Sequence, residues 1–337
     1  MTKQKDYAVR ITGHQKAELQ TVERESKPLA PDELAGRSIV TLISAGTELA
    51  SAYQATSGFP RSVGYAAVFE VELVGNEVND IQVGDYVFCM GNHRSYQRTG
   101  RSNALPLPEG LKPETAIFAR MMGVTMSTLT TTIARPPEKV LVTGLGVVGN
   151  LAAQNFANCG YEVIACEPDE RRRNIAVECG LKRVLPAVPV DDPSIVGQVG
   201  LVVDCSGHEQ AVLDGCNVIR KRGEVVLIAT PWRRYTEIYA HTILHAIFYK
   251  YVVMRSGWEW ELPRYPTDFR TNSIYGNLAG ALKWLAEGRI RVDCLATKVP
   301  PCEAQQAYQN LLNKSSERLT YMFDWSDCLT AGTHRQA

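Results

Sequence analysis

The chain has 337 residues, 45% hydrophobic and 21% charged, and its 36 lysines and arginines balance its 36 aspartates and glutamates. This length suits two domains, the composition is that of a globular enzyme, and the neutral balance argues against a nucleic acid or an anionic membrane as partner. No apolar run reaches the length of a membrane span, and the start "MTKQKDYAVRITG" lacks the apolar core of a secretory signal, so we expect a cytoplasmic protein.

The first part of the chain has short alternating segments such as "SVGYAAVFEVELVG" and "VGDYVFCMG", with a glycine every eight to twelve residues. This spacing is typical of a compact antiparallel β domain. Within it, residues 43–68 have the composition of a substrate loop, with small residues around Thr47, Glu48, Tyr53 and Tyr65. The loop contains no cysteine and no histidine, the side chains that a catalytic metal would require.

The nine cysteines give no alternative metal site. They lie at positions 89, 159, 166, 179, 205, 216, 294, 302 and 328, and no two have the C-x2-C or C-x4-C spacing of a metal knuckle. Several occur inside apolar strands, as in "LVVDCSG". We therefore interpret them as small buried hydrophobic residues in a reducing compartment.

The stretch "EKVLVTGLGVVGNLAAQNFANCGYEVIACEPDE" indicates a dinucleotide-binding βαβ unit. A β-branched run leads into Gly144-x-Gly146-x-x-Gly149, a helical pattern follows, and a second strand ends this segment. Gly144 permits the tight turn, Gly146 the close approach of a pyrophosphate, and Gly149 the packing of helix on strand. The helix N-terminus, at Val147 and Val148, then receives the anion.

The second strand ends at Glu167, eighteen residues after Gly149, where an acid accepts the hydroxyls of a ribose. A carboxylate at this position repels the 2′-phosphate of NADP, so we predict NAD as the cofactor. The arginines of "DERRR" that follow, Arg172 among them, keep NADP open, because one of them could pair with that phosphate. They could equally be the solvated start of the next helix.

Three further apolar runs continue the sheet, namely "RVLPA", "GLVVDCSG" and "GEVVLIAT", with helical patterns between them. This alternation predicts a doubly wound parallel sheet. Ser206 and Thr230 fall at the carboxyl ends of strands, where such sheets bind ligands, so we take them as candidates to line the nicotinamide. The alternative is that they are turn residues only.

The segment "YVVMRSGWEWELPRYPTDFR", residues 251–270, combines aromatic and charged side chains. Trp258 and Trp260 have the character of a carbohydrate site, since sugar C–H faces stack on aromatic rings while hydroxyls bond to charged groups. Packing between subunits explains this composition as well. The pattern of residues 289–325 predicts a strand, a helix and a second strand, and we expect this last strand to return to the first domain.

The phrase "FEVELVGNEVNDIQVGDYVF", followed by "VLVTGLGVVG" and "VVDCSG", resembles the medium-chain dehydrogenase/reductase superfamily over residues 7–325. The likeness is greatest to its zinc-lacking branch, grouped with bacteriochlorophyllide hydroxyethyl dehydrogenases and sugar or polyol dehydrogenases. The resemblance implies an α/β protein with a discontinuous GroES-like catalytic domain (1–117 and 289–337), a Rossmann domain (118–288), and a substrate cleft between them. It also implies NAD(P) and a homodimer or homotetramer, formed through the strand at 250–257.

Alignment with the zinc-dependent members of the superfamily leaves no metal ligand in place. Ala45 falls at the cysteine ligand, Tyr65 at the histidine, Ala66 at the glutamate and Met121 at the third ligand. Alanine offers zinc no donor atom, and neutral tyrosine and methionine bind it poorly. We therefore predict no zinc, and we count Met121 among the substrate-binding candidates. Thr125 falls in the segment that touches nicotinamide in the family.

Without a metal, a side chain must take the proton of the alcohol. Thr47 aligns with the family's hydroxyl relay, and Tyr65 stands at the metal position, where its phenol could bond the substrate oxygen. Tyr53 is the alternative phenol or an aromatic wall of the substrate site, His93 titrates in the right range, and Glu48 orients the loop or binds substrate hydroxyls. Each also has a purely structural alternative, so the general base is left open.

These observations predict a metal-independent NAD(H) dehydrogenase that acts on a small molecule, a secondary alcohol of a sugar, sugar acid, polyol or cyclitol. A zinc-free enone or quinone reductase using NADPH is the first alternative. A nucleotide-binding structural or sensor protein without turnover is the second.

Overall fold

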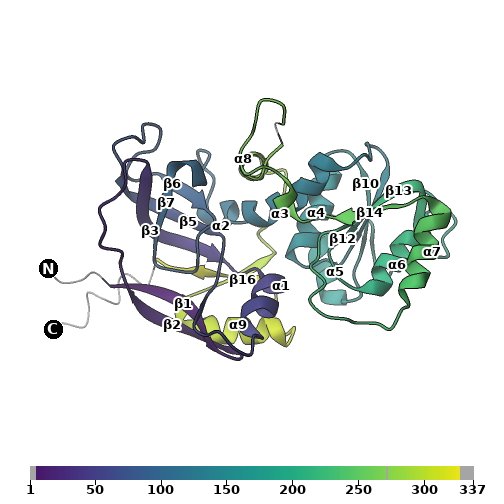
Figure 1. Ribbon diagram of the computed structural model, residues 1–337, viewed down its shortest axis with the longest axis horizontal. Coiled ribbons are helices and arrows are strands. Elements are labelled where there is room, and N and C mark those ends of the chain that lie inside the picture. The colour runs from purple at the N-terminus through teal and green to yellow at the C-terminus, as the bar shows by residue number, and fades with distance from the viewer. Residues whose placement is uncertain (1–4, 271, 327–337) are drawn as a thin grey trace. The chain divides into compact units, whose positions relative to one another are not determined.

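The computed structural model describes residues 5–270 and 272–326, and the chain divides into two compact units (Figure 1). The first unit comprises Met1–Arg120 and Leu295–Ala337, and the second comprises Met121–Cys294. Both boundaries fall within six residues of the expected ones, 117/118 and 288/289. The end of the expected catalytic domain, residues 327–337, lies outside the described residues.

The first unit is built on two β-sheets, one of three strands in the order β2-β1-β4 and one of seven. The larger has the order β15-β16-β3-β5-β6-β8, with β7 pairing β3, and only its β15–β16 pair is parallel. The strands before the second unit are β1 (Lys5–Gly13), β2 (Lys16–Glu23), β3 (Glu33–Leu42), β4 (Arg61–Ser62), β5 (Ala67–Val74), β6 (Tyr86–Cys89), β7 (Tyr96–Gly100) and β8 (Ala104–Pro106). The other elements are α1 (Ala45–Glu48), a π-helical turn (Leu49–Tyr53), a 3-10 turn (Arg101–Asn103), α2 (Pro113–Ala116), β15 (Ala296–Val299), a 3-10 turn (Pro301–Glu303), α9 (Ala304–Leu312) and β16 (Thr320–Asp324).

The last part of the chain completes the core of the first unit. Strand β16 pairs with β3, so the expectation that the last strand returns to the first domain is confirmed. Tyr53, Tyr308, Phe323 and Trp325 are all fully buried in one cluster. Burial of such large aromatic side chains is a main source of stability in a small domain.

The second unit has a six-stranded parallel sheet in the order β11-β10-β9-β12-β13-β14. Its elements are α3 (Ala119–Thr131), which begins in the first unit, β9 (Lys139–Thr143), α4 (Val147–Asn158), β10 (Glu162–Cys166), α5 (Glu170–Glu178), β11 (Val184–Leu185), β12 (Val199–Asp204), α6 (Glu209–Val218), β13 (Ile219–Leu227), α7 (Ala240–Lys250), β14 (Val253–Ser256), a 3-10 turn (Glu259–Glu261) and α8 (Ile274–Ala286). The predicted doubly wound sheet is therefore confirmed, although the run "RVLPA" supplies a strand of only two residues. In the part of the chain that the structure describes, no helix is both long and apolar enough to cross a membrane.

The order of the strands explains where a ligand can bind in the second unit. Strand β9 lies between β10 and β12. The chain first forms β10 and β11 on one side of β9, and it then forms β12, β13 and β14 on the other side. Such a reversal opens a crevice outside the carboxyl ends of the two strands. The glycine-rich loop follows β9, and the segment with Ser206 follows β12, so both lie at this switch point.

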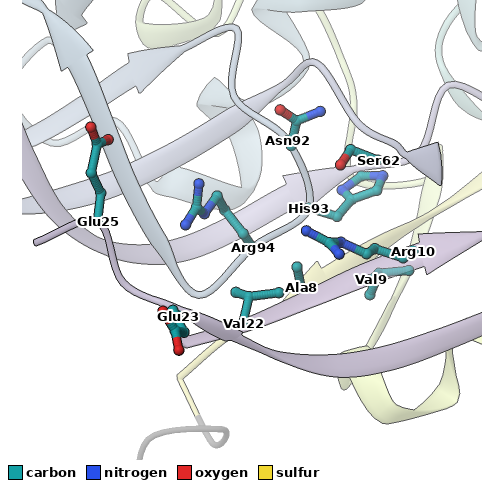
Figure 2. A pocket seen from close by; sticks show the side chains of 10 residues that line it. All are labelled: Ala8, Val9, Arg10, Val22, Glu23, Glu25, Ser62, Asn92, His93 and Arg94. Carbon is teal, nitrogen blue, oxygen red and sulfur yellow. The ribbon is translucent and has the colours of Figure 1, made fainter. Parts of the chain in front are cut away.

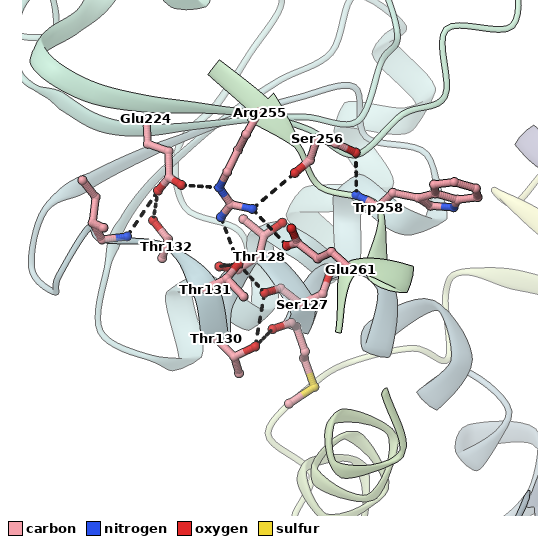
Figure 3. A network of polar contacts seen from close by, with 12 residues as sticks. Ser127, Thr128, Thr130, Thr131, Thr132, Glu224, Arg255, Ser256, Trp258 and Glu261 are labelled. Atoms are coloured by element: carbon pink, nitrogen blue, oxygen red, sulfur yellow. Dashed lines mark hydrogen bonds and ion pairs between the residues drawn. The ribbon is translucent and has the colours of Figure 1, made fainter. Parts of the chain in front are cut away.

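An ion pair between the buried Glu224 and the half-buried Arg255 joins the edge strand β14 to its neighbours (Figure 3). Glu224 of β13, 3% exposed, accepts hydrogen bonds at 2.5 Å from Arg255 Nε and from Thr132 Oγ1. Arg255 also donates to Thr131 Oγ1 at 2.9 Å and to Glu261 Oε1 at 3.2 Å. A buried carboxylate with several donors is held in a single arrangement, so this network fixes both β14 and the start of the segment that follows it.

Candidate functional site

The loop after β9 has the geometry that a dinucleotide requires. Gly144 has φ +81°, and a Cβ added there would lie 2.8 Å from Ser206 Cα. A Cβ on Gly149 would lie 1.8 Å from the carbonyl oxygen of Gly144, so only glycine lets α4 pack this closely. A Cβ on Gly146, by contrast, would meet nothing within 4 Å. The space beside Gly146, at the N-terminus of α4, can thus admit a pyrophosphate.

Glu167 lies beside this loop at the end of β10, where the ribose acid was predicted. It is 4% exposed, and its Oε2 accepts the N–H of Leu145 at 2.8 Å while Oε1 accepts that of Asp169 at 3.1 Å. Arg172 Nη1 lies 3.7 Å from Oε2. The carboxylate is therefore fixed against the glycine-rich loop, and it retains lone pairs for the hydroxyls of a ribose.

Asp204, at the end of β12, was missed in the sequence. It is 1% exposed, and its Oδ1 accepts hydrogen bonds from Thr143 Oγ1 at 2.7 Å and Ser206 Oγ at 2.6 Å, while Oδ2 accepts the N–H of Gly207 at 3.1 Å. Asp204 thus fixes the loop that contains Ser206. The exposed Thr230 follows the neighbouring strand β13, so both predicted residues lie at carboxyl ends of strands.

The residues of the second unit fit a nicotinamide dinucleotide. Of the predicted set, Gly144, Gly146, Gly149, Val147, Val148, Glu167, Arg172, Ser206 and Thr230 lie at or beside the carboxyl ends of β9, β10, β12 and β13. An open glycine, a helix N-terminus and a fixed carboxylate are what the pyrophosphate and ribose of such a group need.

The structure places Thr125 in the interior of the second unit. It is fully buried, its hydroxyl donates to the carbonyl oxygen of Met122 at 2.9 Å, and it accepts a hydrogen bond from Asn155 Nδ2 at 2.6 Å. Its hydroxyl therefore joins α3 to α4, and its place beside a nicotinamide stays a prediction. Met121, predicted at the substrate, is 2% exposed in the same helix. The apolar packing of α3 explains both positions.

In the first unit, hydroxyl groups gather around Tyr65. The Tyr65 hydroxyl donates a short hydrogen bond to Ser44 Oγ, and the Thr47 side chain also bonds to it. Arg120 lies over the ring, with its guanidinium carbon 4.7 Å from the centroid. Burial raises the pKa of Tyr65 above its ordinary value, while Arg120 opposes that rise. The structure thus brings Tyr65 and Thr47 together, and it adds Arg120, which sequence reasoning missed. We call Tyr65, Ser44, Thr47 and Arg120 the Tyr65 cluster.

Glu48 orients the loop, as one of its predicted roles requires. It is 3% exposed, and its Oε1 accepts the N–H of Ser44 at 2.7 Å. Its Oε2 accepts a hydrogen bond from the Tyr308 hydroxyl at 2.5 Å and lies 3.1 Å from His93 Nε2. Because Glu48 reaches Ser44 through a backbone N–H, these bonds do not form a continuous proton path to Tyr65.

His93 lies in the interior of the first unit. It is fully buried, and its Nδ1 lies 2.8 Å from Thr41 Oγ1. Thr41 Oγ1 also accepts the indole N–H of Trp325 at 3.0 Å. Since a carboxylate only accepts, the contact with Glu48 requires a proton on Nε2 of the His93 ring. These contacts give His93 a part in holding Glu48, and its role in proton transfer stays a prediction.

Tyr53 lies in the core of the first unit. Its ring is fully buried and stacks on Tyr308 with centroids 5.2 Å apart. The hydroxyl donates to Gln309 Oε1 and accepts from Gln305 Nε2, both at 3.0 Å. A ring enclosed in this way serves the core, and its contact with a substrate stays a prediction.

A cavity of about 240 Å³ lies elsewhere in the first unit (Figure 2). It is lined by Ala8, Val9, Arg10, Val22, Glu23, Glu25, Ser62, Asn92, His93 and Arg94. Its walls come from β1, β2 and the segments around Ser62 and His93, and the Tyr65 cluster takes no part in it.

Trp258 and Trp260 are 65% and 49% exposed and follow the edge strand β14. The backbone N–H of Trp258 donates to Ser256 Oγ at 3.1 Å, and the nearby Glu261 accepts a hydrogen bond from Arg255. Both rings are therefore available to a ligand or to another protein surface.

The positions that align with zinc ligands do not suit zinc here. Ala45 and Ala66 have no donor atom, Tyr65 is bonded to other hydroxyls, and Met121 is buried. Across residues 5–270 and 272–326, no three side chains of histidine, cysteine, aspartate or glutamate gather as a metal site would require.

Comparisons with known proteins agree with this geometry. The family described as zinc-binding dehydrogenase matches residues 147–261, a segment that contains none of the four aligned ligand positions. L-galactonate-5-dehydrogenase of Escherichia coli K12 is 24% identical over 206 residues, covering 50% of this chain and 60% of that protein. Sorbitol dehydrogenase of Halalkalibacterium halodurans is 28% identical over 169 residues, covering 44% of this chain and 49% of that protein. The chain thus spans about half the length of these relatives.

The whole fold is shared with solved structures. Galactitol-1-phosphate dehydrogenase from Escherichia coli superposes with a TM-score of 0.79, at 16% identity, over 94% of this chain and 99% of that one. The matched family segment, the strand order of the second unit and this shared fold agree with one another. The likeness to dehydrogenases therefore covers residues 147–261 in sequence and nearly the whole chain in fold.

Proposed function

We propose that the chain is an oxidoreductase that oxidises a secondary alcohol of a sugar, sugar acid, polyol or cyclitol, or reduces the matching ketone, with NAD as cofactor. The observation that carries this proposal is the open space at Gly146 beside the fixed carboxylate of Glu167. That pair suits a pyrophosphate and an unphosphorylated ribose. When bound, the nicotinamide exchanges a hydride with the carbinol carbon. Relatives named for L-galactonate and sorbitol support the substrate class.

The enzyme works without a metal, as a member of the zinc-lacking branch that the sequence resembles. The positions aligned with the ligands offer zinc no suitable donor set, and the Tyr65 cluster stands there instead. Tyr65 binds the substrate oxygen and takes its proton, while Thr47 hydrogen-bonds the phenol. Trp258 and Trp260 supply aromatic faces for a carbohydrate.

The active form is an oligomer of identical subunits joined through β14. This strand is at the edge of the six-stranded sheet, and its Val253 is 49% exposed. The neighbouring α7 exposes 61% of Leu244 and 75% of Phe248. An open sheet edge beside exposed apolar side chains is a surface that a second copy can cover.

The test is NAD⁺ reduction across a panel of sugars, sugar acids, polyols and cyclitols, with protein stripped by a chelator and assayed for residual metal. We expect turnover in the stripped protein. Activity that returns only with added zinc would contradict the metal-free proposal. Turnover of enones with NADPH alone would favour the reductase, and nucleotide binding without turnover of any substrate would favour a sensor or structural protein.

The choice of NAD over NADP is expected to depend on Glu167. Glu167→Ala removes the carboxylate that repels a 2′-phosphate and leaves Arg172 beside the vacated position, so the ratio of NAD to NADP affinity should fall. Isothermal titration with both dinucleotides measures this ratio. Glu170→Ala, which removes an exposed carboxylate nearby, is the matched control and should leave it unchanged. An equal ratio in wild type and Glu167→Ala would remove Glu167 from cofactor selection.

A further inference from the structure

A metal-free alcohol dehydrogenase needs another source of positive charge. The substrate oxygen or the base that takes its proton carries negative charge during the reaction, and burial alone disfavours that charge. Tyr65 illustrates the difficulty, because burial is the largest influence on its pKa and raises it. A phenol with a raised pKa is a poor base at neutral pH.

Arg120 is the charged group that opposes this effect. It is 4% exposed, and its guanidinium carbon lies 4.7 Å from the centroid of the Tyr65 ring. An arginine is charged at any physiological pH, and a cation over an aromatic ring acts more strongly where water is excluded. The remaining groups around Tyr65 are Ser44 and Thr47, which bond its hydroxyl, and Glu48, whose negative charge acts against Arg120.

We propose that Arg120 supplies the charge that a metal supplies in the zinc-dependent relatives, by stabilising Tyr65 in its deprotonated form. The inference rests on the proposed function, and it makes Arg120 a positioning residue that acts through Tyr65. In the step assigned to Tyr65, the O–H bond of the substrate breaks, the proton joins the phenolate oxygen, and the electron pair stays on the substrate oxygen. In the reverse direction, Tyr65 returns that proton to the ketone oxygen.

The first test measures Tyr65 directly, in protein without cofactor or substrate. Tyrosine labelled at Cζ is followed by carbon NMR as the pH is raised, and the Tyr65 signal is assigned by its loss in Tyr65→Phe. In Arg120→Met, we expect the midpoint of Tyr65 titration to rise by about one pH unit or more. Arg120→Lys keeps a positive charge and should restore part of this shift.

Arg233→Met is the matched control, since the Arg233 guanidinium carbon lies at the same 4.7 Å from the Tyr235 ring on the exposed surface of the second unit. It should leave the Tyr65 midpoint unchanged. An equal midpoint in wild type and Arg120→Met would overturn the proposal. If Arg120→Met does not fold, the comparison is made with Arg120→Gln, which also removes the positive charge, and an unchanged Tyr65 midpoint in that variant would overturn the proposal equally.

The second test uses activity. With the best alcohol of the panel, Arg120→Met should lower kcat/KM at pH 7 by about tenfold or more and move the rising limb of the pH profile upward by the shift seen in NMR. Added methylguanidinium should recover part of the loss. A uniform loss at every pH would indicate a structural role for Arg120 and overturn the proposal. A wild-type protein that oxidises no alcohol would overturn the proposed function instead, whatever NMR shows of the Arg120–Tyr65 pair.

Discussion

Replacing Tyr65 with phenylalanine is expected to lower kcat for the alcohol substrate by at least about tenfold, near the low end of the contribution of a general acid or base. The phenol is placed among Ser44, Thr47 and Arg120, and the variant removes only the oxygen that exchanges the proton. The ring and its contact with Arg120 remain, so the fold should persist. Steady-state kinetics, with the melting temperature as a check, make the measurement.

The control for losing a tyrosine hydrogen bond is Tyr161→Phe. The Tyr161 hydroxyl donates to the carbonyl oxygen of Ala134 at 3.0 Å within the second unit, whereas Tyr65 belongs to the first. This variant should lose a little stability and keep its turnover. A Tyr65→Phe enzyme as fast as wild type would leave Tyr65 as a packing residue, and the search for the base would move to Thr47 and its neighbours.

Gly146 and Gly149, in the glycine-rich loop after β9, are expected to respond differently to replacement by alanine. The first should lose cofactor affinity and the second should lose stability. At Gly146 the methyl group meets nothing and φ is −62°, so Gly146→Ala should change the free energy of unfolding by less than about 1 kcal/mol. The methyl group does fill the space beside the helix N-terminus. Affinity for NAD should therefore fall by about tenfold or more, which titration calorimetry measures.

At Gly149 the same methyl group would lie 1.8 Å from the carbonyl oxygen of Gly144, so α4 must move away from β9. Gly149→Ala should lower the free energy of unfolding by about 3 kcal/mol or more, seen as a lower midpoint in chemical denaturation. If both variants lose only stability, or neither loses affinity, then the loop does not bind the dinucleotide as proposed.

Much of the second unit could be predicted from the sequence, because its signals are local. The glycine spacing, the helical pattern and the terminal acid at Glu167 all fall within one stretch of about thirty residues. The doubly wound sheet followed from alternating apolar runs. Strand β11 shows the limit, since its two residues are too few for a pattern to define.

The contacts of the first unit were harder to predict, because they join residues far apart in the chain. Glu48 is hydrogen-bonded to Tyr308, 260 residues away in the sequence, and Thr41 is hydrogen-bonded to Trp325, 284 residues away. No local pattern shows that Tyr53 stacks on Tyr308 in the core. Arg120 was missed for the same reason, since nothing in the helical run around it points to the ring of Tyr65.

The position of β16 has a consequence for the order in which the protein folds during synthesis. Strand β3 of the first unit pairs with residues 322–324, and Trp325, fully buried, completes the aromatic core. The second unit, Met121–Cys294, has been synthesised in full before any of these residues is made. Nascent chains should therefore form the second unit first, while the unfinished first unit leaves the apolar face of β3 accessible to chaperones until the last strand arrives.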